Sequence, residues 1–584
     1  MRLSPLCLAV SLTLLGACNQ QPTRAELGAE SLDSAAASAA AEFDAADAAS
    51  AKVEGKSRPA AASQAPSEPS RQTNLQPVTT AIFAAGSPPP PGPAKMHLQE
   101  AIGLAPSNTE NYAAHEDNPI QRVAETPVST FSIDVDTGSY SNVRRMLLAG
   151  QRPPADAVRA EEMINYFDYG YPAPSNRNAP FRVSTEIASA PWNAKHQLLQ
   201  IGIQGYRVPR AEIPASNIVF LIDTSGSMQD QDKLPLLKLS FRELVRQLRP
   251  QDRVSLVVYA GSAGLVLPPT AGDEQEKILA ALDQLEAGGS TNGGEGLQLA
   301  YAMARQAFIR NGVNRVVLAT DGDFNVGTVD QKALETMIGD QRKSGIALTT
   351  LGFGTGNYND AMAEQLADLG NGNHAYIDSI NEGRRVLVEE MAATMLTIAQ
   401  DVKIQLEFNP AVVAEYRLIG YENRALRRED FNNDKIDAGE IGAGHDVTAL
   451  YEITLVDSGG ESVDPLRYGK PDVARNAASN ELAWLRLRYK QPGSDSSRLM
   501  ESALTRSQIR QAASPRLRWS AAVAAYADLL RGGSNVGAFG WNQVQALAAG
   551  AGGDDRWGYR AEFLDLVGRA RAVTGGDKPV AISE

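Results

Sequence analysis

Short, mostly apolar runs alternate with amphipathic stretches through the middle of the chain. Such runs are typical of strands that are buried on both faces of a sheet, and they occur at 218–222, 254–259, 316–319 and 346–351. After the first run, apolar side chains recur at helical spacing up to Pro250, namely Leu237, Phe241, Leu244 and Leu248. Strand and helix therefore alternate, which predicts an α/β fold with a doubly wound, mostly parallel sheet over residues 214–400.

The regions on either side of this α/β segment read as β-rich. Strands are expected before it at 181–187 and 198–203, and after it at 402–408, 416–421, 447–455 and 482–489. We therefore expect β-rich regions over 120–213 and 401–495. Because both flanks are β-rich, a sandwich built from the two together is the expected arrangement. Residues 496–584 are expected to be helical, since apolar residues follow one another there at helical spacing.

The first 119 residues have a different composition. Arg2 and an apolar run from Leu6 to Leu15 have the charge and length of a signal peptide over residues 1–17. The segment Leu15-Gly16-Ala17-Cys18 resembles a bacterial lipobox, which implies cleavage before Cys18 and lipidation of its thiol. Residues 18–119 are rich in Ala, Ser and Pro and predict a disordered tether. Asn19 follows the cysteine, which by the same resemblance favours the outer membrane of the cell envelope.

Charge and the scarce ligand types exclude several functions. The chain has 584 residues and a formal net charge of −14. An acidic chain repels phosphate backbones, so nucleic-acid binding is not expected. The five histidines lie far apart, and the only cysteines are Cys7 and Cys18. Neither zinc-peptidase chemistry nor a disulfide framework is therefore expected.

Candidate metal ligands occur in three loops of the α/β segment. The first strand ends in Asp223-Thr224-Ser225-Gly226-Ser227, and the strand at 316–319 runs into Thr320-Asp321. Between them, a loop that leads into a helix contains Thr291. In such sheets ligands bind at the carboxyl ends of the strands, so these side chains are expected at one edge. Carboxylate and hydroxyl oxygens suit Mg²⁺, with Mn²⁺ or Ca²⁺ as alternatives.

These three loops resemble the metal-ion-dependent adhesion site of von Willebrand factor type A (VWA) domains, which have a Rossmann-like fold. The resemblance implies that Ser225, Ser227 and Thr291 coordinate the metal directly. It also implies that Asp223 and Asp321 act through bound waters and hydrogen bonds, with one metal position left for an acidic side chain of a protein partner.

The resemblance continues outside the α/β segment. Residues 131–140 and 161–167, and then 431–434 and 437–444, are similar to regions of bacterial YfbK-type VWA lipoproteins. This resemblance covers most of the chain from about residue 120 onward. It implies no established activity.

Three functions stay open on the sequence alone. The favoured one is a membrane-anchored lipoprotein that binds a protein partner through Mg²⁺ and is not an enzyme. A second is an envelope hydrolase, either metal-dependent or of the aspartic type, because Asp136-Thr137-Gly138-Ser139 matches the aspartic-peptidase tetrapeptide. A third is a structural lipoprotein whose metal site is empty. The absence of a second Asp-Thr-Gly, and of a motif-level general base beside the metal loops, favours the binding protein.

Overall fold

The computed structural model describes residues 109–576, except 291, 323–330, 391–392, 394, 465 and 468–479. The predicted signal peptide, Cys18, most of the tether and Thr291 lie outside the described residues. Within the described part of the chain, no helix is both long and apolar enough to cross a bilayer.

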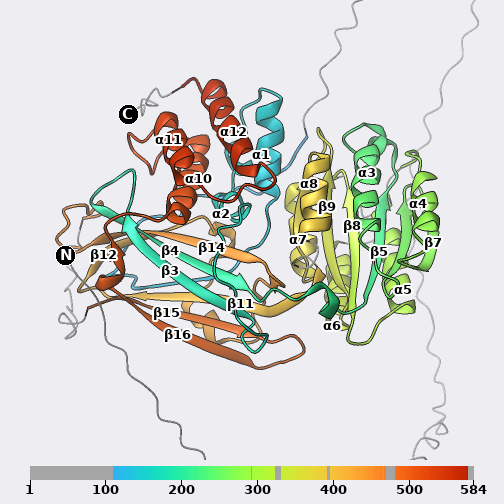
Figure 1. The fold of residues 1–584 in the computed structure, drawn as a ribbon, viewed down its shortest axis with the longest axis horizontal. Helices are drawn as coiled ribbons and strands as arrows, with labels where there is room; N and C mark the ends of the chain where they lie inside the picture. Colours follow the sequence, from blue (N-terminus) through green and yellow to red (C-terminus); the bar gives the residue numbers. More distant parts are fainter. Residues whose placement is uncertain are drawn as a thin grey trace, which may run out of the picture. The chain divides into compact units, whose positions relative to one another are not determined.

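One six-stranded sheet forms the α/β domain (Figure 1), and its strand order is β10-β9-β8-β5-β6-β7. All neighbouring pairs are parallel except β6 with β7. The bounds are β5 Ser216–Asp223, β6 Arg253–Tyr259, β7 Ala263–Ala271, β8 Val313–Thr320, β9 Ala347–Phe353 and β10 His374–Ile377. The expected doubly wound, mostly parallel sheet is confirmed.

Helices cover both faces of this sheet because the central strand is apolar on both sides. Phe220 and Ile222 of β5 pack in one core with α3 and α4, whereas Val219 and Leu221 pack in another with α5, α6 and α7. The bounds are α3 Leu234–Val245, α4 Gln275–Asp283, α5 Gly293–Gln306, α6 Gln331–Lys343, α7 Asp360–Leu369 and α8 Ile380–Arg384. The two cores hold the carboxyl ends of the strands in a fixed position.

The strands of both flanks form two further sheets. One has the order β1-β12-β14-β4-β3-β17, and the other has β13-β11-β15-β16 with β2 paired to β11. Their inner faces share one hydrophobic core, so they form a sandwich from segments before and after the α/β domain. The bounds are β1 Gln121–Arg122, β2 Val128–Ser132, β3 Phe181–Ser189, β4 His196–Gly205, β11 Thr397–Phe408, β12 Val413–Ile419, β13 Ile441–Gly442, β14 Asp446–Leu455, β15 Glu481–Lys490, β16 Ser497–Thr505 and β17 Ile509–Arg510.

Five helices pack together in a separate core, which is rich in aromatic and alanine side chains. They are α1 Gly138–Leu148, α2 Ala160–Asn165, α10 Pro515–Arg531, α11 Trp541–Ala551 and α12 Tyr559–Val573. Figure 1 shows the N-terminal α1 beside the C-terminal α12. Trp519 and Trp541 are buried in this core, whereas Trp557 is 47% exposed.

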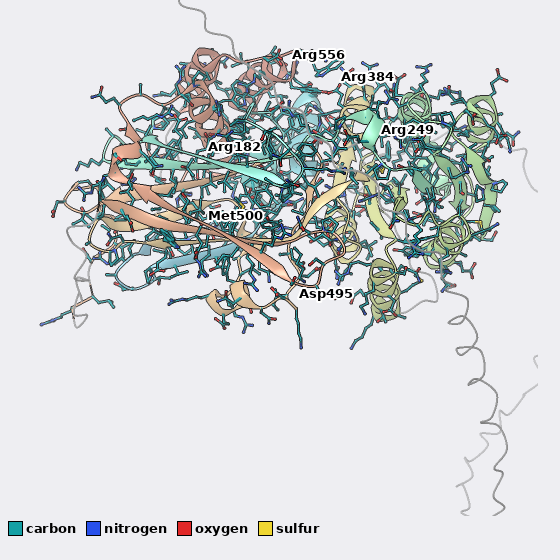
Figure 2. All side chains as sticks on the ribbon, turned by 60° about the horizontal axis from the view of Figure 1, so that its bottom comes forward. Arg182, Arg249, Arg384, Asp495, Met500 and Arg556 are labelled. Atoms are coloured by element: carbon teal, nitrogen blue, oxygen red, sulfur yellow. The ribbon has the colours of Figure 1, made fainter. Side chains whose placement is uncertain are left out.

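Three expected regions need correction. The disordered tether expected over 18–119 is wrong at its end, because residues 109–119 are described and the backbone N–H groups of Thr109 and Asn111 donate to the carbonyls of Gly356 and Tyr358 at 2.8 and 2.9 Å. The expectation of helix throughout 496–584 is wrong at its start, because β16 and β17 come first and α10 begins at Pro515. Met500, labelled in Figure 2, lies on β16, which pairs along its length with β15. Its Leu, Met, Glu and Ala residues favour helix locally, but strand pairing supplies the backbone hydrogen bonds. Likewise, the β-rich region 120–213 also contains α1 and α2.

Candidate metal centre

The two predicted aspartates lie at the ends of adjacent parallel strands. Asp223 is the last residue of β5, and Asp321 directly follows β8. In the strand register Ile222 is opposite Ala319, so both carboxylates reach the same edge of the sheet. Both residues are 0% exposed. The fold therefore brings together two carboxylates from positions about 100 residues apart in the sequence.

The loop after β5 turns its polar atoms toward one another. The Ser225 backbone N–H donates to Asp223 Oδ1 at 2.8 Å. The hydroxyl oxygens of Ser225 and Ser227 are 3.0 Å apart, with Ser225 buried and Ser227 exposed. The arrangement thus presents two hydroxyls between a buried carboxylate and solvent.

The third loop is hydrogen-bonded to the first. Gly226 N–H donates to the Gly289 carbonyl at 3.0 Å, and Gly288 N–H donates to the Thr224 carbonyl at 2.8 Å. Thr291 itself lies outside the described residues, so its contacts are not part of this geometry. The backbone of its loop nevertheless reaches the Asp223 loop two residues before it.

Burial dominates the electrostatics of Asp223. It raises the pKa of this carboxyl to about 6, against the effect of the Ser225 N–H, while the nearby Asp321 charge adds to the rise. Tyr259, at the end of β6, donates a hydrogen bond that lowers the Asp223 pKa in part. Two buried carboxylates at one edge of the sheet, each sensing the charge of the other, favour a cation between or beside them.

Sequence reasoning missed a cation at this edge. Lys233, which precedes α3, places its Nζ 3.0 Å from Asp321 Oδ2 and 3.1 Å from Asn357 Oδ1. The side chain of Lys233 is 5% exposed. No spacing rule indicates that a lysine ten residues after Asp223 contacts Asp321, which follows the neighbouring strand β8 in the sheet. The sequence therefore offered no signal for this contact.

The residues present fit a hard divalent cation. The described part of the site offers two buried carboxylates and two serine hydroxyls, all oxygen donors, which suit Mg²⁺. Nowhere in the described residues, this site included, does a group of three or more His, Cys, Asp or Glu side chains form a metal-binding cluster, so the donors here are two carboxylates and hydroxyls. A Mg²⁺ ion held here would supply Lewis acidity and a position for an anionic ligand.

The Asp136-Thr137-Gly138-Ser139 tetrapeptide lies at the N-terminal end of α1. Thr137 precedes α1, and Asp136 Oδ1 accepts a hydrogen bond from the His374 backbone N–H at 2.8 Å. Asp136 Oδ2 lies 3.5 Å from Arg424 Nη2, and Asp134 Oδ1 lies 3.3 Å from the same nitrogen. Asp136 is 3% exposed. These contacts are those of a buried carboxylate that joins elements, and Asp134 and Asp136 line one small cavity together with Arg424.

Comparison with known families assigns the modules. Residues 217–385 match the family model described as "von Willebrand factor type A domain", and residues 106–200 match one described as "von Willebrand factor". Residues 393–573 match "Uncharacterized protein YfbK, C-terminal". VWA domains in general mediate protein–protein interactions, and many bind a divalent metal at the adhesion site.

A relative from Escherichia coli K12, "Uncharacterized protein YfbK", is 48% identical over 489 residues. The match spans 82% of this chain and 84% of that protein. The chain belongs to the YfbK family. The chain is also similar to human inter-alpha-trypsin inhibitor heavy chain H3, which is 24% identical over 259 residues, or 41% of this chain and 28% of that one.

Solved structures align with this YfbK-family chain at lower similarity. A von Willebrand factor type A protein from Catenulispora acidiphila covers 66% of this chain and 88% of its own, with 16% identity and a TM-score of 0.36. The ArnB paralog VWA2 from Sulfolobus acidocaldarius covers 68% and 98%, with 15% identity and a TM-score of 0.33.

Proposed function

We propose that this protein is a lipid-anchored lipoprotein of the cell envelope whose VWA domain binds a protein partner through a Mg²⁺-dependent adhesion site. The observation that carries the proposal is the pairing of two fully buried aspartates with two serine hydroxyls at the carboxyl edge of the sheet. Hydroxyl ligands leave a cation less neutralised than an all-carboxylate cage does. Such a cation favours an acidic side chain of the partner.

The proposed action is binding rather than turnover. The described contacts of Asp223 and Asp321 include hydroxyls, the Ser225 backbone N–H and a lysine already paired with a carboxylate. A hydrolase would need a base placed to activate a nucleophile beside the metal. The nearby Tyr259 does not serve, because burial raises its pKa well above the usual value.

Affinity capture with the purified full chain tests the proposal. A partner captured from envelope extract in Mg²⁺ should elute in chelator and bind again when Mg²⁺ is restored. Ser227→Ala and Thr291→Ala should each lower the captured amount about tenfold or more, since each removes a metal ligand. Thr336→Ala, on the exposed surface of α6, is the matched control and should capture normally.

A partner that stays bound in chelator and to both variants would place the interface elsewhere. Cleavage of a peptide or ester by the wild type, lost in Asp223→Asn, would favour the hydrolase instead.

A further inference from the structure

Lys233 is a buried lysine at the edge of the candidate metal centre. Lysine is almost never fully buried unless it is paired, and here its ammonium contacts Asp321 Oδ2 at 3.0 Å and Asn357 Oδ1 at 3.1 Å. The side chains of Lys233 and Asp321 are 5% and 0% exposed. The ion pair is therefore shielded from water. In this buried setting a charge acts more strongly on its neighbours than it would at the surface.

The surrounding backbone fixes the lysine in this position. Gly354, with φ +75°, packs against the aliphatic stem, and a Cβ at that residue would lie 2.3 Å from Lys233 Cγ. The backbone N–H of Lys233 donates to the Asp230 carbonyl at 3.0 Å, and its carbonyl accepts from Leu237 N–H at 2.9 Å. The chain thus reserves space for this side chain along the whole of its length.

We propose that the Lys233 ammonium is an internal cation of the adhesion site, which neutralises Asp321 in the metal-free protein and opposes the binding of Mg²⁺. This inference rests on the proposed function, because it concerns the same site. The fixed positive charge of Lys233 beside Asp321 repels a divalent ion that approaches Asp223. It also occupies one Asp321 carboxylate oxygen, which is then less available to the waters bound to the ion. Metal then binds weakly until a partner supplies a further negative charge.

The inference assigns Lys233 a role in coupling metal to partner. With Lys233 present, the acidic side chain of the partner contributes charge that the site itself lacks, so partner and Mg²⁺ each increase the affinity for the other. Without it, Mg²⁺ should bind readily to the protein alone. A purely structural lysine would give the opposite result, since its loss would disorder the site and weaken the metal.

Calorimetric titration of the purified full chain with Mg²⁺, and separately with Mn²⁺, tests the competition. Lys233→Met should lower the Kd for either ion about tenfold or more, because one repelling charge is lost. Lys233→Arg keeps the charge and should stay near the wild-type value. Lys277→Met removes an exposed lysine of the same domain and should leave the Kd unchanged.

A double-mutant cycle in chelator tests the neutralisation without any metal. Lys233→Met and Asp321→Asn should each lower the melting temperature, and the double variant should lose less than the sum of the two. Additive losses, or a Kd unchanged or raised in Lys233→Met while the wild type binds Mg²⁺, would overturn this inference alone. No binding of either ion by any variant would overturn the proposed metal-dependent function and the competition with it, whereas the cycle would still report the pairing.

Discussion

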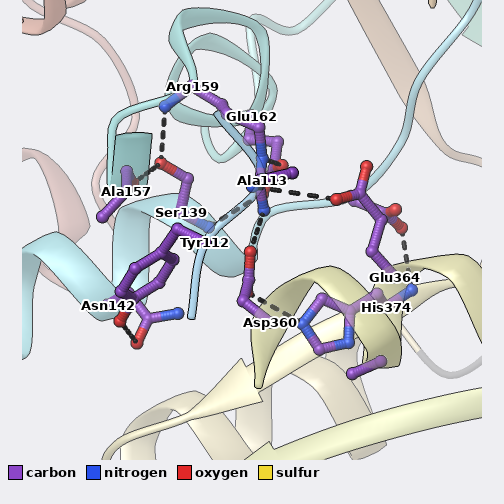
Figure 3. A network of polar contacts seen from close by, with 12 residues as sticks. Tyr112, Ala113, Ser139, Asn142, Ala157, Arg159, Glu162, Asp360, Glu364 and His374 are labelled. Carbon is purple, nitrogen blue, oxygen red and sulfur yellow. Dashed lines mark hydrogen bonds and ion pairs between the residues drawn. The ribbon is translucent and has the colours of Figure 1, made fainter. Parts of the chain in front are cut away.

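At the scale of single residues, buried arginines join the N-terminal flank to the VWA domain. Arg159 donates from Nη2 to Asp360 Oδ2 at 2.6 Å, pairs with Glu162 and lies 3.7 Å from Glu364 (Figure 3). Asp360 also faces His374 at 3.4 Å. Although burial alone would raise it, the Arg159 guanidinium and His374 hold the pKa of Asp360 well below its usual range. The network therefore keeps a buried carboxylate ionised.

Arg159→Met should strongly destabilise the protein. The substitution leaves Glu162 and Asp360 buried without their guanidinium, and breaking a buried pair in this way costs about 3–5 kcal/mol. The loss is measured by urea unfolding of the variant and the wild type. Arg152→Met, at an exposed position in the same flank, should change stability by no more than about 0.5 kcal/mol. Equal stability of the two variants would mean that the network does not support the fold.

At the scale of secondary-structure elements, the strands that are buried on both faces were predicted from the sequence, whereas β7 and β10 at the two edges of the sheet were missed. The central strands are apolar on both faces, so their positions could be predicted from pattern alone. β7 was missed because Pro268 and Pro269 lie inside it, and proline removes ladder donors. It is tolerated because β7 is an antiparallel edge strand with an irregular register. β10 has only four residues, too few for a periodic signal.

The candidate site shows the same limit. Asp223, Ser225, Ser227 and Asp321 could be predicted because strand ends and loop motifs are local features, and the parallel register then brings them to one edge. Lys233 could not, because its contact with Asp321 joins residues 88 positions apart. The reach of a long side chain from the residue before a helix follows no spacing rule. The cation at the site therefore became visible only in the folded structure.

At the scale of the whole molecule, the VWA domain is inserted between two halves of one sandwich. β4, before the insertion, pairs along its length with β14 after it, and β2 pairs with β11. The flanks therefore form a single β-sandwich support, which the VWA domain interrupts in the sequence. In the proposed function, the N-terminal segment that carries Cys18 would connect this support to a membrane.

Cys18→Ala should release the protein from membranes. The lipobox-like segment motivates lipidation at this residue, and several acyl chains on one cysteine are needed for a stable anchor. Cell fractionation and labelled fatty-acid incorporation measure the effect. Cys7→Ala is the matched control, since Cys7 would leave with the signal peptide. A Cys18→Ala protein that still pellets with membranes, together with no label in the wild type, would contradict the lipoprotein proposal.

The central claim is that the two buried aspartates and their hydroxyl neighbours form a Mg²⁺ site. Its most direct test is the melting temperature of the purified full chain, measured in Mg²⁺ and in chelator. Binding to the folded state should stabilise the wild type by about 2.7 kcal/mol at a hundredfold excess over Kd. Asp223→Asn should remove this increment, whereas Asp340→Asn, exposed on α6, should retain it. A wild-type melting curve that is the same in chelator and at this hundredfold excess of Mg²⁺ over Kd would contradict the account.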